Sequence, residues 1–115
     1  MFFNTEEHND TVIVKIPQRF LAETVQDFKS VIQASMERAD RDFILDFGAT
    51  DMVDSSALGA IVAVYKSISL TQRVLVLSSL NDTVRTLFEL TQLQKIFPIE
   101  ESLDDALELL KKNAD

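Results

Sequence analysis

The residues of this chain best suited to chemistry are aspartates and serines that lie close together in the sequence. Asp46, Asp51 and Asp54 lie shortly before Ser55 and Ser56, and Asp54 is directly adjacent to Ser55. Carboxylates gathered in this way can hold a hard cation such as Mg²⁺. A serine hydroxyl can act as a nucleophile beside a base, or accept a phosphoryl group. The stretch therefore raises three hypotheses, namely a metal site, a catalytic serine and a phosphorylation site.

Neither catalytic hypothesis is completed elsewhere in the sequence. A Ser-His-Asp site requires contact between serine and histidine, and the single histidine, His8, lies near the amino terminus with nothing to place it beside Ser55. The Gly-x-Ser-x-Gly elbow is also absent. A magnesium site of the response-regulator type needs an acidic pair after the first strand, whereas Ile16 is followed by Pro-Gln-Arg. We therefore predict a protein that is not an enzyme, with no metal and no cofactor.

Two interpretations of Ser55 remain open on the residues alone. Asp54 and Ser55 are typical of a helix start, where a side-chain cap stabilises by about 1 kcal/mol. The same position also exposes a hydroxyl to modification, and a phosphate there adds about −1.5 to −2 charge units. A partner that buried Ser55 would then have to desolvate a dianion, which is a sufficient reason for its release.

The apolar pattern predicts how these residues are positioned. Strands are expected at 2–5, 11–16, 42–47, 73–77 and 95–99, with a turn at His8-Asn9-Asp10 after the first. Helices are expected along 21–36, along 58–68, after a cap at Asn81, and after a capping box at Ser102 and Asp105. Because helices separate apolar strands, we expect an α/β fold with a mixed, mostly parallel sheet of four to five strands and about four helices. Ser55 would then follow the carboxyl end of the strand at 42–47, where open α/β sheets place their sites.

Composition and charge narrow the function classes. The chain has 115 residues, which we expect to form a single domain over 1–115. Its net charge of −8 argues against nucleic-acid binding and against anionic membranes. It has no cysteine and no apolar run long enough for direct membrane insertion, so we expect a cytoplasmic protein.

Asp54 to Gly59, with the sequence Asp-Ser-Ser-Ala-Leu-Gly, resembles the motif of the STAS domain found in bacterial anti-sigma factor antagonists. The segments 84–96 and 101–110 are similar to the third-helix segment and the last helix of that family, so the resemblance covers nearly the whole chain. It implies a partner-switching protein that binds an anti-sigma factor, usually a serine kinase of the histidine-kinase-like ATPase class. That kinase would phosphorylate the serine after the aspartate, here Ser55, and a metal-dependent serine phosphatase would reverse the step. Ser56 aligns with the next Ser/Thr position of the family, which is less often the acceptor.

We therefore predict a partner-binding surface around the phosphorylation site. It consists of Asp51, Met52, Val53, Asp54, Ser55, Ser56 and Leu58. An alternative within the same family is a STAS subunit that is not phosphorylated and docks on a membrane lipid-transport complex.

The chain departs from the family pattern in three places. Ala57 stands where glycine is usual, and alanine raises helix propensity by up to about 1 kcal/mol. Pro17-Gln18-Arg19-Phe20 replaces a Gly-x-Leu-Asp turn, and Gln92 replaces a common glycine. The second departure lies beside the expected site and predicts a specialised partner.

Overall fold

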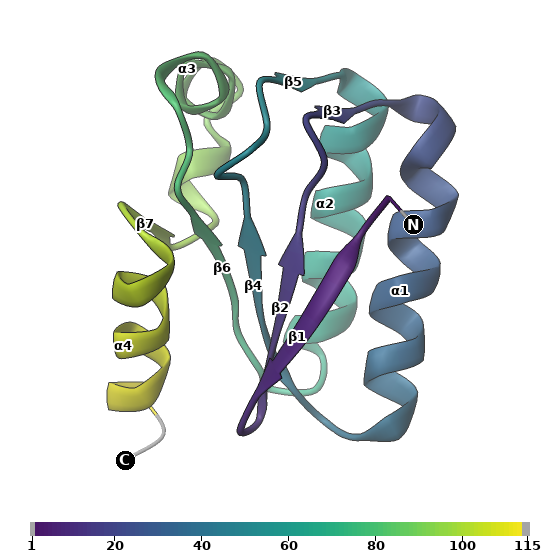
Figure 1. Cartoon of the computed structure of the whole chain (residues 1–115), viewed down its shortest axis with the longest axis vertical. Coiled ribbons are helices and arrows are strands. Elements are labelled where there is room, and N and C mark those ends of the chain that lie inside the picture. The colour runs from purple at the N-terminus through teal and green to yellow at the C-terminus, as the bar shows by residue number, and fades with distance from the viewer. Residues whose placement is uncertain (1, 114–115) are drawn as a thin grey trace.

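A five-stranded sheet with helices on both faces organises the chain (Figure 1). A computed structural model describes residues 2–113. The strands are β1 (Asn4–His8), β2 (Thr11–Lys15), β3 (Arg19–Phe20), β4 (Asp42–Asp46), β5 (Met52–Val53), β6 (Leu75–Ser78) and β7 (Ile99–Glu100). The helices are the 3₁₀ turns η1 (Ala22–Thr24) and η2 (Leu93–Lys95), with α1 (Val25–Arg38), α2 (Ser55–Ser69), α3 (Asp82–Leu90) and α4 (Leu103–Asn113).

The main sheet is mixed and mostly parallel, as the alternation of strands and helices predicts. Its strand order is β1-β2-β4-β6-β7, with β1 antiparallel to β2 and every later pair parallel. The parallel strands therefore share one amino edge and one carboxyl edge. In Figure 1 the carboxyl edge lies at the top, where β5 and the start of α2 are found, and the β1–β2 turn lies at the bottom.

The two faces of the sheet carry cores of unequal size. The larger core packs α1, α2 and α3 against one face and contains Phe28, Phe43 and Ile61, each with no exposed surface. The smaller core packs Ala106 and Leu110 of α4 against the other face. Among residues 2–113, no helix is long and apolar enough to cross a membrane.

Two strand predictions were wrong in position. The first strand begins at Asn4, because the turn residue Asn9 adopts a left-handed φ of 55° and sets His8 opposite Thr11. The last strand begins at Ile99, not at Lys95. Local 3₁₀ hydrogen bonds hold the preceding residues, and Gln92 precedes them in the left-handed conformation (φ 61°) that glycine adopts more easily.

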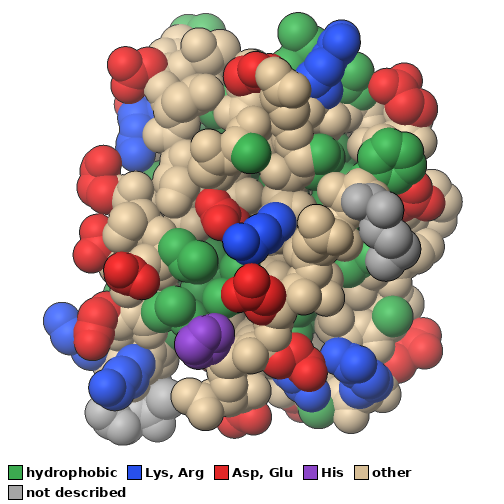
Figure 2. Space-filling view, viewed as in Figure 1, with side chains coloured by type: hydrophobic (Ala, Val, Ile, Leu, Met, Phe, Trp, Pro, Cys, Tyr) green, Lys and Arg blue, Asp and Glu red, His purple; other side chains and the backbone are tan. Residues whose placement is uncertain are grey.

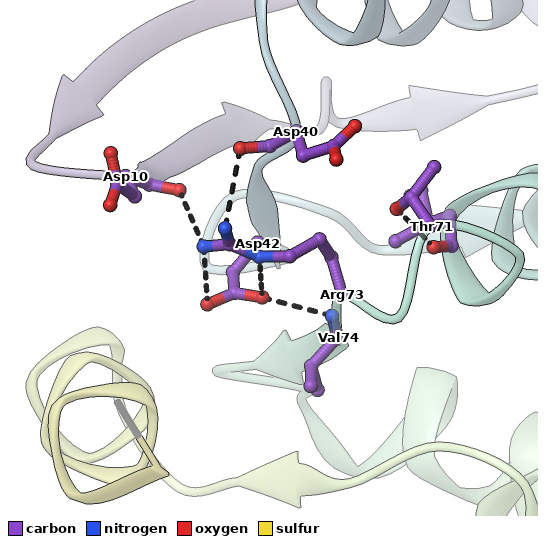
Figure 3. A network of polar contacts seen from close by, with 7 residues as sticks. Asp10, Asp40, Asp42, Thr71, Arg73 and Val74 are labelled. Atoms are coloured by element: carbon purple, nitrogen blue, oxygen red, sulfur yellow. Dashed lines mark hydrogen bonds and ion pairs between the residues drawn. The ribbon is translucent and has the colours of Figure 1, made fainter. Parts of the chain in front are cut away.

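At the amino edge, Arg73 lies just before β6 and clamps three segments together (Figure 3). Its Nε and Nη2 donate to the Asp42 carboxylate over 2.9 and 3.1 Å. Longer bonds of 3.4 Å reach the carbonyls of Asp10 and Asp40. The same carboxylate accepts from the Val74 N–H over 2.9 Å. We call this set of contacts the Arg73 clamp; it ties the β1–β2 turn and the α1–β4 connection to the start of β6.

Candidate functional site at the start of helix α2

Asp54 holds the beginnings of two helices with one carboxylate. Its Oδ1 accepts the Ala57 N–H over 2.9 Å, which caps α2, and its Oδ2 accepts the Ala22 N–H over 2.9 Å, which caps η1. The first contact confirms the predicted helix start. The second was not predicted, because it joins residues far apart in the sequence. Asp54 thereby anchors the segment before α1 to the residue directly before Ser55.

A two-stranded parallel sheet forms above the main sheet, from segments that the sequence pattern predicted as loops. Arg19 pairs with Met52 and Phe20 with Val53. The connection is reinforced by Gln18, whose carbonyl accepts the Asp51 N–H and whose Nε2 donates to the Asp51 carboxylate, both over 2.9 Å. The departure Pro17-Gln18-Arg19-Phe20 thus lies directly against the predicted partner surface. Such two-residue strands show no alternating pattern, so only tertiary contact reveals them.

The predicted surface residues differ in accessibility. Ser55 and Ser56 are exposed in the first turn of α2, and Met52 and Asp51 are exposed before it. Val53 and Asp54 are half-buried, while Leu58 is only 8% exposed and belongs to the larger core. The exposed part of the predicted surface is therefore formed by 51, 52, 55 and 56, with Leu58 supporting it from below.

The aspartates raised as metal ligands have separate structural roles. Asp46 Oδ1 accepts the Gly48 N–H over 2.9 Å, Asp51 accepts from Gln18, and Asp54 caps the two helices. Within the described residues, no three His, Cys, Asp or Glu side chains are grouped to hold a metal ion. His8 ends β1 at the amino edge, opposite the end of the sheet where α2 starts (Figure 1). The structure therefore does not bring a histidine to Ser55.

An apolar groove runs beside the site, between β5 and α3. It encloses about 340 Å³ and is lined by Asp51, Met52, Val53, Thr83, Val84, Thr86, Leu87 and Leu90. Leu90 is 78% exposed, and Met52 is 46% exposed. The groove was not predicted from the sequence. A signal was present, since Leu90 lies off the face that buries Val84 and Phe88.

On the face seen in Figure 2, acidic and basic side chains are interspersed, and the basic ones do not gather into a patch. Near Ser55 the balance is acidic, because Asp51 and Asp54 precede it and the first turn of α2 contains no basic residue. The amino end of a helix attracts an anion through its free N–H groups, but the Ala57 N–H already binds Asp54. One N–H group at this helix end is therefore already occupied.

Comparison with known proteins gives one consistent result. The profile of the STAS domain family matches residues 2–106. A protein of Bordetella bronchiseptica named anti-sigma factor antagonist BtrV is 29% identical over 75% of this chain and 74% of its own length. The crystal structure of an anti-sigma factor antagonist from Thermotoga maritima shares 27% identity, with a TM-score of 0.86 over 95% of this chain and 94% of that one.

The fold is also that of SpoIIAA, which has been solved in two chemical states. The unphosphorylated form aligns with a TM-score of 0.85 at 17% identity, over 96% of each chain. The phosphorylated form of SpoIIAA, a Bacillus cell fate determinant, aligns with a TM-score of 0.76 at 16% identity, over 94% of this chain and 98% of that one.

Proposed function

Since this chain belongs to the STAS domain family and is like the anti-sigma factor antagonists, a generally regulatory family that acts on anti-sigma factors, we propose that it is a partner switch controlled at Ser55. The unphosphorylated protein binds an anti-sigma factor that is also a serine kinase of the histidine-kinase-like ATPase class. The exposed residues 51, 52, 55 and 56 form the centre of the contact. The observation that carries the proposal is the exposed Ser55 hydroxyl at the first position of α2, held by the Asp54 cap.

The chemical step belongs to the kinase, and this chain supplies the acceptor. Ser55 Oγ attacks the γ-phosphorus of ATP, an O–P bond forms, and the bond to the β-phosphate oxygen breaks so that ADP leaves. The hydroxyl proton passes to a base on the kinase. A metal-dependent serine phosphatase hydrolyses the new bond with water and returns serine and inorganic phosphate.

The physical basis of switching is the charge of the product. A phosphate of about −1.5 to −2 units beside Asp51 and Asp54 is repelled by them, and its desolvation under a partner is costly. Because Asp54 already takes the Ala57 N–H, the phosphate cannot use that donor of the helix end. We therefore expect release of the partner with little change of fold. The phosphorylated state of SpoIIAA, which keeps the same fold, supports this expectation for the fold alone.

The test is binding of purified anti-sigma kinases encoded by the source organism, each titrated against defined forms of the protein. Unmodified protein and Ser55→Ala should bind equally, and phosphoserine at 55 should weaken binding about 100-fold, equivalent to about 2.7 kcal/mol. Ser55→Asp should weaken binding less, because its single charge imitates a dianion poorly. Phosphoserine at Ser67, exposed further along α2, is the matched control and should leave binding unchanged. Equal affinity of the Ser55-phosphorylated and unmodified proteins would overturn the switch.

The modification itself is checked on protein isolated from its host under several growth conditions. Peptide mass spectrometry should show a condition-dependent phosphate on Ser55. Phosphate on Ser56 instead would move the acceptor by one residue. Its absence in every condition would favour a constitutive docking subunit, such as the STAS component of a lipid-transport complex, in which Ser55 is only part of the helix start.

A further inference from the structure

We infer that the groove between β5 and α3 receives an amphipathic helix of the anti-sigma factor, one whose apolar ridge is flanked by basic side chains. This inference rests on the proposed function, and it names a second contact that does not depend on phosphorylation.

The shape of the groove fits a helix. Its α3 wall runs from Thr83 to Leu90, about two turns and on the order of 10 Å at 1.5 Å per residue. A bound helix places apolar anchors at positions i, i+3 or i+4, and i+7, which span a similar length. The opposite wall is the two-residue strand β5, held in place by β3 and the Gln18–Asp51 contacts. Both walls are therefore formed before the partner arrives.

The exposure of two apolar lining residues indicates that a partner binds this surface. Leu90 is 78% exposed and Met52 is 46% exposed, so two of the five exposed large apolar side chains among the described residues border one groove. Grouped exposed apolar side chains of this kind mark interaction sites, whereas scattered ones do not. Leu70, 87% exposed at the end of α2, is a scattered case and does not line this groove.

Charge decides which occupant fits. Among the described residues that line the groove, Asp51 is the only charged one, and Asp82 lies in the first turn of α3 next to Thr83. Arg19, which contacts Met52 Sδ over 3.7 Å, places one cation at the same border, so acidic side chains still outnumber basic ones there by two to one. The chain as a whole carries −8. A second copy of this chain would bring like charges together, which costs affinity. A partner helix with lysine or arginine beside its apolar ridge meets the acidic border favourably, and such steering raises the association rate.

The groove lies next to Ser55 along the chain, and this position indicates what a second contact would do. Met52 and Val53 line the groove, and Ser55 lies two residues beyond Val53. A helix in the groove would therefore hold the partner beside the Ser55 hydroxyl. Its apolar contact would persist while the charge at Ser55 changes, so the groove would supply affinity and Ser55 would supply control.

The test compares Leu90→Ser with Leu70→Ser in binding to the purified anti-sigma kinase. Both leucines are highly exposed, so both variants should keep the melting temperature of the unaltered protein. We expect Leu90→Ser to weaken binding at least tenfold and Leu70→Ser to change it less than twofold. Hydrogen exchange on the kinase should show protection of a helical segment rich in leucine and in lysine or arginine, and Leu90→Ser should remove that protection.

The outcomes separate this inference from the proposed function. If the unaltered protein binds the kinase and Leu90→Ser binds as well as Leu70→Ser does, the groove is not a contact and the switch at Ser55 stands. If the protected kinase segment is acidic or extended, the named occupant is wrong. If the unaltered protein binds no anti-sigma kinase, both proposals fall together.

Discussion

The two edges of the central sheet use polar side chains in opposite ways. At the amino edge, the Arg73 clamp turns polar groups inward, and the Asp42 side chain is only 16% exposed within it. At the carboxyl edge, the Asp54 carboxylate accepts two backbone N–H groups, whereas Ser55, Ser56 and Met52 are exposed to solvent. The contrast shows that one edge closes the fold, while the other presents exposed side chains around the start of α2.

Breaking the Arg73 clamp should have the largest effect on stability. Arg73→Ala leaves the Asp42 carboxylate half-paired and removes contacts to three segments, so we expect a loss of about 2 kcal/mol in the free energy of unfolding. Arg19→Ala removes only an exposed contact to Met52 Sδ at 3.7 Å and should cost less than about 0.5 kcal/mol. Urea unfolding of both variants measures the difference.

The same variant sharpens the comparison, because Arg73→Ala should bind the anti-sigma kinase like the unaltered protein. Weaker binding at a temperature where the variant is fully folded would show that the two edges are coupled.

The clamp also has a defined pH dependence. The Asp42 hydrogen bonds raise the pKa of Arg73. The stability that Arg73 contributes is therefore fully present below the pKa that Arg73 has in the unfolded chain. That contribution is lost only when the pH rises through the raised value. Within pH 6 to 9, the stability difference between Arg73→Ala and the unaltered protein should therefore show no change from Arg73 titration.

Removing the double cap should have the next largest effect. Asp54→Ala frees the N–H groups of Ala57 and Ala22, and we expect a loss of about 1–2 kcal/mol. Asp51→Ala removes one exposed side-chain contact with Gln18 and should lower the free energy of unfolding by less than about 0.5 kcal/mol. Thermal unfolding monitored by circular dichroism compares the two. Equal losses would mean that the two caps together contribute no more than the exposed Gln18–Asp51 contact.

A gain of stability is expected at the carboxyl edge, and it is the smallest effect. Gly59 lies within α2, and outside the helix's own nearby backbone an added Cβ would have no neighbour within 4 Å, so Gly59→Ala should stabilise by about 0.5–1 kcal/mol. At Gly48 the added Cβ would lie 3.1 Å from Asp46 Oδ1, so Gly48→Ala should destabilise. Denaturant unfolding of the pair gives the signs. A loss at Gly59 would reveal a packing role that the open space around it does not show.

Most helices could be predicted because their apolar residues repeat at regular intervals, and the central strands because they are short, nearly continuous apolar runs. Phe28 and Ile32 on α1 are buried as the period of 3.6 requires, whereas Phe43, Ile44 and Leu45 on β4 are all buried because helices cover both faces of this central strand. The Asn81 and Ser102 caps are also confirmed, by bonds of 2.9 Å to the Val84 N–H and 3.0 Å to the Asp105 N–H. The last strand was misplaced because two residues in a ladder carry no periodic signal.

The amino-acid sequence by itself determined the order of the elements, the Asp54 cap on α2 and the position of Ser55 after a buried strand. Each follows from local spacing, or from a side chain that binds backbone only a few residues away. Only the tertiary structure decided that Asp54 also binds Ala22, that Gln18 holds Asp51, and that Met52 and Leu90 border one groove. These contacts join segments more than thirty residues apart, and the path of the chain through the sheet brings them together.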